Sequence, residues 1–294
     1  LALPLGAITR RHYLDATARP PSMGRVVVSR RRRSTRRRRR GRAEVTRWRL
    51  DVAYDGSGFR GFAVNVGIRS VAGELQGALA KMCGHEVVLV CAGRTDAEVH
   101  ARRQVVHFES DANLDSLRMV RSLNRMLGPE IAVIAALVVP GSFDARFSAI
   151  WRRYRYSVVT SVWVDPQLAR FVWHTEGDLD AEAMREAAQT FVGRHDFSAF
   201  CRRTPPAPGR PERSRVRNLF EFAIVPDGTN RLDFWVLASS FCHHQVRSMV
   251  GTLVEVGEGR RSVASVAEAL ESQDRQQCGR VAPAHGLTLW EVGY

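Results

Sequence analysis

The sequence predicts an α+β fold made of two ferredoxin-like halves, each with the element order β-α-β-β-α-β. Apolar residues recur with the period of a strand in some segments and of a helix in others, and the order of these segments repeats after Pro140-Gly141. Apolar residues also make up 45% of the chain, enough for residues 45–294 to bury a core. We therefore expect a mainly antiparallel sheet that carries helices, with an active cleft where the halves meet.

The first half begins with a strand in which every second residue is large and apolar: Trp48, Leu50, Val52 and Tyr54. A helix should follow Ser70, a good N-cap residue, because apolar side chains recur at helical spacing up to Met82. A second helix should turn Leu114, Leu117 and Leu127 inward. The full prediction is a strand at 48–54, a helix at 71–82, strands at 86–91 and 104–108, a helix at 114–127 and a strand at 131–139.

The second half repeats this order without visible sequence identity to the first. Its predicted elements are a strand at 154–160, a helix at 181–192, strands at 219–225 and 232–237, a helix at 243–256 and a strand at 287–292. An additional helix is expected at 262–271. Four prolines and six arginines between Arg202 and Arg217 indicate an exposed loop.

Charge divides the chain into three predicted parts. Residues 1–49 hold 16 Arg and two acids, which leaves 28 basic and 28 acidic side chains in the remainder of a chain with net charge +14. Residues 1–44 are therefore expected to be a disordered, arginine-rich extension, followed by halves at 45–145 and 146–294. The extension could hold RNA phosphates non-specifically or have no function, and composition does not choose between these.

Composition also argues against several classes. The longest apolar run, 131–139, is about half of the ~18 residues that a membrane span needs. Five scattered cysteines without a C-x-x-C pair argue against a structural zinc site or a disulfide framework, and favour the reducing cytoplasm. Gly56–Gly61 matches G-x-G-x-x-G, but no helix is predicted to begin there, so a dinucleotide site is not expected. His243 and His244 lack a third ligand at a suitable spacing, which argues against a metal site.

The strongest candidate for a catalytic residue is Asp96. It lies in a short polar loop between two predicted buried strands, where a rigid frame can hold a side chain for chemistry. The alternative is a turn aspartate that binds nearby backbone N–H groups. Residue type alone favours that alternative.

Four segments, in order, resemble the tRNA pseudouridine synthase A family. They are Tyr54–Gly61, Gly93–Val105, Asp144–Tyr156 and Phe241–Gly257. The resemblance covers roughly residues 45–294 and implies a homodimeric isomerase that acts on tRNA. It would convert uridine to pseudouridine at positions 38, 39 and 40 of the anticodon stem-loop. We expect it to need no cofactor or metal and not to associate with a membrane.

The resemblance also implies roles for individual residues. Asp96 would be the nucleophile, Arg247 its ion-pair partner and Arg94 an RNA-facing neighbour. The chemistry fits, because breaking and remaking a glycosidic bond needs an ionised carboxylate, and a guanidinium favours that charged form. Whether the carboxylate attacks ribose C1′ or the base stays open.

Base recognition would fall to Tyr154, which by resemblance stacks on the extruded uridine. Spacing alone slightly favours Tyr154 and Tyr156 as core aromatics on one strand face. Arg153 and Arg155 would point to the opposite face and hold RNA phosphates, and Arg152 is expected to join them.

Glu98 departs from the family pattern, which usually has glycine there. A side chain at this position could strain the backbone, and its charge could raise the pKa of Asp96. A catalytically impaired RNA-binding relative is therefore one alternative. A hydrolase that pairs Asp96 with Glu98 is another. Phe62 and Asn65, in place of the usual Trp and Gln, are milder changes.

Overall fold

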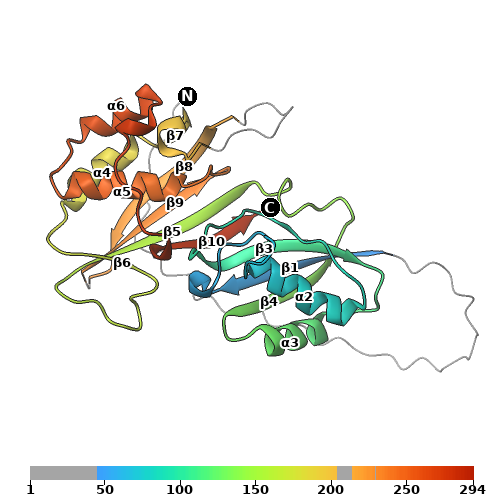
Figure 1. The fold of residues 1–294 in the computed structure, drawn as a ribbon. Helices are drawn as coiled ribbons and strands as arrows, with labels where there is room; N and C mark the ends of the chain where they lie inside the picture. The colour runs from blue at the N-terminus through green and yellow to red at the C-terminus, as the bar shows by residue number, and fades with distance from the viewer. Residues whose placement is uncertain (1–44, 204–213, 229) are drawn as a thin grey trace, which may run out of the picture. The chain divides into compact units, whose positions relative to one another are not determined.

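A ten-stranded, mostly antiparallel sheet forms the centre of the computed structural model, which describes residues 45–203, 214–228 and 230–294 (Figure 1). The strands are β1 (Thr46–Tyr54), β2 (Val90–Cys91), β3 (His100–Ser110), β4 (Ile131–Val139), β5 (Trp151–Thr160), β6 (Trp173–Thr175), β7 (Gly193–Asp196), β8 (Val216–Pro226), β9 (Arg231–Ala238) and β10 (Leu287–Gly293). The helices are α2 (Val71–Cys83), α3 (Ser116–Leu127), α4 (Ala181–Gln189), α5 (Gln245–Gly257) and α6 (Ala264–Ser272).

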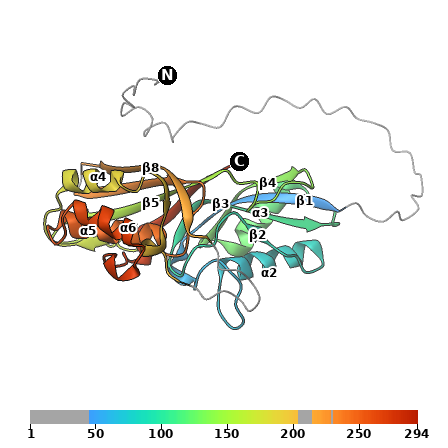
Figure 2. The ribbon, with the colours of Figure 1, turned by 90° about the horizontal axis from the view of Figure 1, so that it is seen from above.

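The order of the strands confirms the predicted fold class. The main path runs β4-β1-β3-β10-β5-β9-β8-β7, and β2 pairs with β3. Residues before β5 therefore give the order β4-β1-β3-β2, and residues from β5 onward give β10-β5-β9-β8, all in antiparallel pairs. Both are the fourth-first-third-second order of a ferredoxin-like unit. Helices α2 and α3 lie beside the first set, and α4 to α6 beside the second (Figure 2).

One edge of β3 joins the two sets. Strand β10 pairs with the beginning of β3 in parallel, through Thr288 to His100 and Leu289 to Ala101. Strand β2 pairs with a later part of the same edge, at Val106 and His107. The loop from β2 to β3, which carries Asp96, therefore lies where the two sets of strands meet. The boundary at residue 145 stays a prediction.

The helices follow their predicted signals, with one error in orientation. Ser70 caps α2 by accepting a hydrogen bond from the Gly73 amide. In α3 the prediction that Leu117 points inward is wrong, because this side chain is 64% exposed. The buried residues are Met119, Leu123 and Leu127, which recur every four positions, whereas Leu117 lies two positions from Met119, on the other side of the helix.

Other predicted elements need correction. The strand at 86–91 is paired only at Val90–Cys91, and β6 and β7 were not predicted at all. The expectation of unpaired cysteines is wrong for Cys201 and Cys242, which form a disulfide with their Cα atoms 5.8 Å apart. The predictions for residues 1–44 and for most of the arginine-rich loop at 202–217 lie outside the described residues. Within the described ranges, no helix is long and apolar enough to cross a membrane.

Candidate active site

The loop that carries Asp96 is held by the segment after β1. The Phe62 amide donates to the Thr95 carbonyl at 3.1 Å, and the hydroxyls of Tyr54 and Thr95 are 2.8 Å apart. Gly61 adopts a φ of +103°, and a Cβ there would lie 3.1 Å from the Thr95 carbonyl oxygen. Only glycine suits this backbone and this close approach. The G-x-G-x-x-G segment is therefore a turn that buttresses the loop, and the next helix begins only at Val71.

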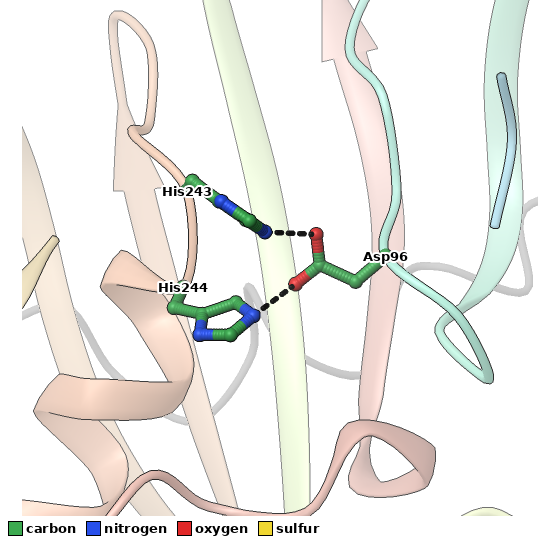
Figure 3. A group of neighbouring side chains, drawn as sticks. All are labelled: Asp96, His243 and His244. Atoms are coloured by element: carbon green, nitrogen blue, oxygen red, sulfur yellow. Dashed lines mark ion pairs between the residues drawn. The ribbon is translucent and has the colours of Figure 1, made fainter. Parts of the chain in front are cut away.

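Asp96 faces the beginning of α5 and the two histidines just before it, His243 and His244, which Figure 3 shows beside the carboxylate. His243 Nε2 lies 3.3 Å from Asp96 Oδ1, and His244 Nε2 lies 3.5 Å from Oδ2. Arg247 Nη1 donates to Oδ2 at 3.4 Å, while its Nε donates to the Ala282 carbonyl at 2.8 Å. The predicted partner of Asp96 is thus in contact with it. The second bond fixes the guanidinium on the chain segment that leads to β10.

The surroundings of Asp96 favour a negative charge. Its side chain is 26% exposed, so it is sheltered but open to a ligand, and the positive end of the α5 dipole lies beside it. Burial lowers the pKa of His244 to about 4, against the opposing charge of Asp96, so this ring is neutral at pH 7. Arg247 therefore supplies a permanent positive charge to the carboxylate, while His244 supplies a neutral polar contact.

Tyr154 lies beside the loop of Asp96, on β5. A Cβ added at Gly93 would be 3.9 Å from the Tyr154 hydroxyl, and the ring packs edge-on against Phe241 at 5.1 Å. Burial, the neighbouring phenol of Tyr54 and the charge of Asp96 raise the pKa of Tyr154, so its phenol stays protonated. Both tyrosines belong to the buried core, but Tyr154 keeps 8% of its surface exposed, whereas Tyr156 is fully buried and donates to the Pro283 carbonyl.

The three arginines of β5 do not share one environment, although the sequence predicts that all three hold RNA phosphates. Arg152 is 7% exposed and donates to four backbone carbonyls, which makes a phosphate contact impossible without unfolding. Arg153 lies 3.7 Å from Glu221, and Arg155 lies 4.0 Å from Asp233 and stacks over Trp290. Both point away from Tyr154 by strand alternation. Arg94 is exposed on the loop of Asp96 itself.

His243 and His244 are the site residues that sequence reasoning missed. Sequence spacing shows no third potential ligand near the two histidines. The third one is Asp96, which lies in a distant loop that the fold brings to the beginning of α5. The one local signal was the pair of histidines just before a predicted helix, followed by Arg247.

Glu98 occupies the backbone conformation that favours glycine, with a φ of +66°. Its side chain is exposed, and its amide donates to the Phe59 carbonyl at 3.3 Å. A residue with a Cβ is disfavoured by about 1–2 kcal/mol in this conformation. Glycine, however, has a larger conformational entropy in the unfolded chain, which offsets part of this gain. The replacement Glu98→Gly should therefore raise the free energy of unfolding by about 0.5–1 kcal/mol.

Chemical denaturation of Glu98→Gly and wild type measures this difference. Gln273→Gly is a matched control, because Gln273 is also exposed, has a φ of +54° and ends α6 far along the chain. Both variants should gain stability. A loss of stability in Glu98→Gly alone would show that the Glu98 side chain makes a contact that outweighs its backbone cost.

Several known proteins match 84% of the chain. A family model described as "tRNA pseudouridine synthase" matches residues 187–294. A protein of Methylobacterium sp. (strain 4-46), "tRNA pseudouridine synthase A", is 44% identical over 84% of this chain and 97% of its own length. Proteins of the same description from Caulobacter vibrioides (strain NA1000 / CB15N) and Bacillus pumilus (strain SAFR-032) are 43% and 38% identical, each over 84% of this chain and 98% of the relative.

Among solved structures, a chain of the archaeal box H/ACA sRNP Nop10-Cbf5 complex is 11% identical. The match covers 78% of this chain and 59% of the other. Its TM-score of 0.34 is too low to support an argument.

Proposed function

The chain belongs to the tRNA pseudouridine synthase A family, and from this premise we propose that Asp96 is the nucleophile of its reaction. The protein is an isomerase that converts uridine in tRNA to pseudouridine. We further propose that its target uridines are those at positions 38, 39 and 40 of the anticodon stem-loop.

One observation carries this proposal. A partly exposed carboxylate, Asp96, lies where the two sets of strands join. Arg247 of α5 and the two histidines just before that helix surround it. Arg247 places a positive charge 3.4 Å from the carboxylate, and the side chain of Asp96 is 26% exposed, so a substrate can reach it.

The reaction breaks the bond between N1 and C1′, turns the base and joins C5 to C1′. C5 then loses its proton and N1 gains one, so the product is an isomer of uridine. An ionised Asp96 can attack either C1′ or the base, and both routes are compatible with its position. Because the base must leave its stack, it needs a planar surface to rest on. Tyr154 offers its ring next to the loop of Asp96, and its high pKa suits stacking or hydrogen bonding by a neutral phenol. The steps conserve electrons, so they require no redox cofactor.

The remaining RNA contacts follow from charge and position. Arg94, exposed on the catalytic loop, is placed to hold a phosphate beside the target nucleotide. Arg153 and Arg155 lie on the opposite face of β5, so they would contact a different part of the tRNA and would compete with Glu221 and Asp233. Action as a homodimer in the cytoplasm, without a resident metal, belongs to the same proposal.

The purified protein should form pseudouridine in an unmodified tRNA transcript, at positions 38, 39 and 40. Mapping the product by chemical labelling of pseudouridine tests this, and a transcript with cytidine at all three positions is the control. Pseudouridine at other positions only would contradict the proposed substrate site. Tight tRNA binding without any product would instead indicate the impaired RNA-binding relative.

A further inference from the structure

Three potential metal ligands meet at Asp96. Asp96, His243 and His244 each offer one potential ligand atom, a carboxylate oxygen or an imidazole nitrogen, and these three atoms lie within 4.8 Å of one another. His243 Nε2 lies 3.3 Å from Asp96 Oδ1, and His244 Nε2 lies 3.5 Å from the other carboxylate oxygen, Oδ2. Ligands bound to Zn²⁺ at about 2.0–2.1 Å in a tetrahedron are separated by roughly 3.3 Å, so these groups need only small movements to share one ion.

We propose that Asp96, His243 and His244 bind a divalent transition-metal ion such as Zn²⁺, and that the ion and the uridine exclude each other. Two imidazoles and one carboxylate are a common ligand set for such ions, and solvent can complete the coordination. Exclusion follows because a carboxylate bound to a metal is no longer free to attack. This second part rests on the proposed function, whereas metal binding by itself does not.

The cluster is accessible, but it is not optimised for a cation. The side chain of His243 is 39% exposed, which lets an ion reach the site from solvent. Arg247 Nη1 lies 3.4 Å from Asp96 Oδ2, and its positive charge opposes an incoming cation. The ion is therefore an inhibitor that competes with the arginine for the carboxylate. Removing Arg247 should strengthen metal binding while it weakens catalysis.

Calorimetric titration of ZnCl₂ into the full-length protein without RNA tests the binding. Wild type should show one site that His243→Ala and His244→Ala each weaken at least tenfold, and that Arg247→Met tightens. His85→Ala is a matched control, because His85 is also 39% exposed with a carboxylate oxygen of Asp111 3.3 Å from its Nε2. Its Zn²⁺ affinity should equal that of wild type. Equal affinity in wild type, His243→Ala and His244→Ala would overturn the proposal.

Cobalt separates this site from the cysteines. Co²⁺ bound at Asp96 should show ligand-field absorption without the charge-transfer band of a thiolate, and a thiolate band would assign the ion to cysteine instead. In the pseudouridine assay, Zn²⁺ should inhibit, more tRNA should relieve the inhibition, and EDTA should reverse it. If the protein makes no pseudouridine, the titration still decides the binding. Binding without inhibition of an active enzyme would overturn the exclusion.

Discussion

Replacing Asp96 by Asn should lower the rate of pseudouridine formation on the order of 10⁴-fold or more, while tRNA binding changes little. Asn keeps the shape of the side chain and can still contact His243 and His244, but it lacks the charge that attacks carbon. Losses of this size follow removal of a nucleophile in other enzymes. A single-turnover assay with excess enzyme on an unmodified tRNA transcript measures the chemical step directly.

Glu98→Gln is the matched control for this experiment. It also converts one carboxylate to an amide in the same loop. Among the described residues, however, Glu98 is exposed and forms no ion pair with His243, His244 or Arg247. Its rate should stay close to that of wild type. A rate for Asp96→Asn above a tenth of the wild-type rate would rule out Asp96 as nucleophile, and an equal loss in Glu98→Gln would point to the charge of the loop as a whole.

The second large effect concerns stability. Arg152→Met should lower the free energy of unfolding by about 3–5 kcal/mol, because it removes a buried charge from carbonyl groups that depend on it. The guanidinium donates to the carbonyls of Ala92, Arg146, Ala149 and Ser239 at 2.8–3.1 Å. It thereby ties the start of the loop that carries Asp96 to the end of β9 and to the segment before β5. Methionine fills much of the volume but leaves these oxygens unpaired.

Arg153→Met is the control, because it makes the same change one residue further along β5. Arg153 is partly exposed and pairs with Glu221 at 3.7 Å, and such surface pairs contribute about 0–1 kcal/mol. Urea denaturation should therefore separate the two variants by at least 2 kcal/mol. Similar stabilities would show that the carbonyls find other partners when Arg152 is removed. Weaker tRNA binding by Arg153→Met alone would support its phosphate contact.

Local periodicity determined most of the fold class. The bounds predicted for the strand at 131–139 agree with β4, and the apolar spacing after Ser70 predicted α2 to within one residue. These features depend on which side of one element is buried, and that information lies in neighbouring residues. The repeated element order then left few arrangements of two antiparallel units, because short connections limit the topology. The position of Asp96 in a loop between two strands also followed from the sequence.

Tertiary structure alone decided how the site is assembled. Asp96 meets His243, His244 and Arg247 because β10 and β2 share one edge of β3, and this long-range pairing has no local pattern. Tertiary packing also buries Arg152 against four carbonyl groups, and it brings Cys201 to Cys242 from 41 residues along the chain. Residue type and spacing describe what a side chain can do. Which groups surround it depends on segments distant in the chain, and only their packing brings those groups within a few ångströms.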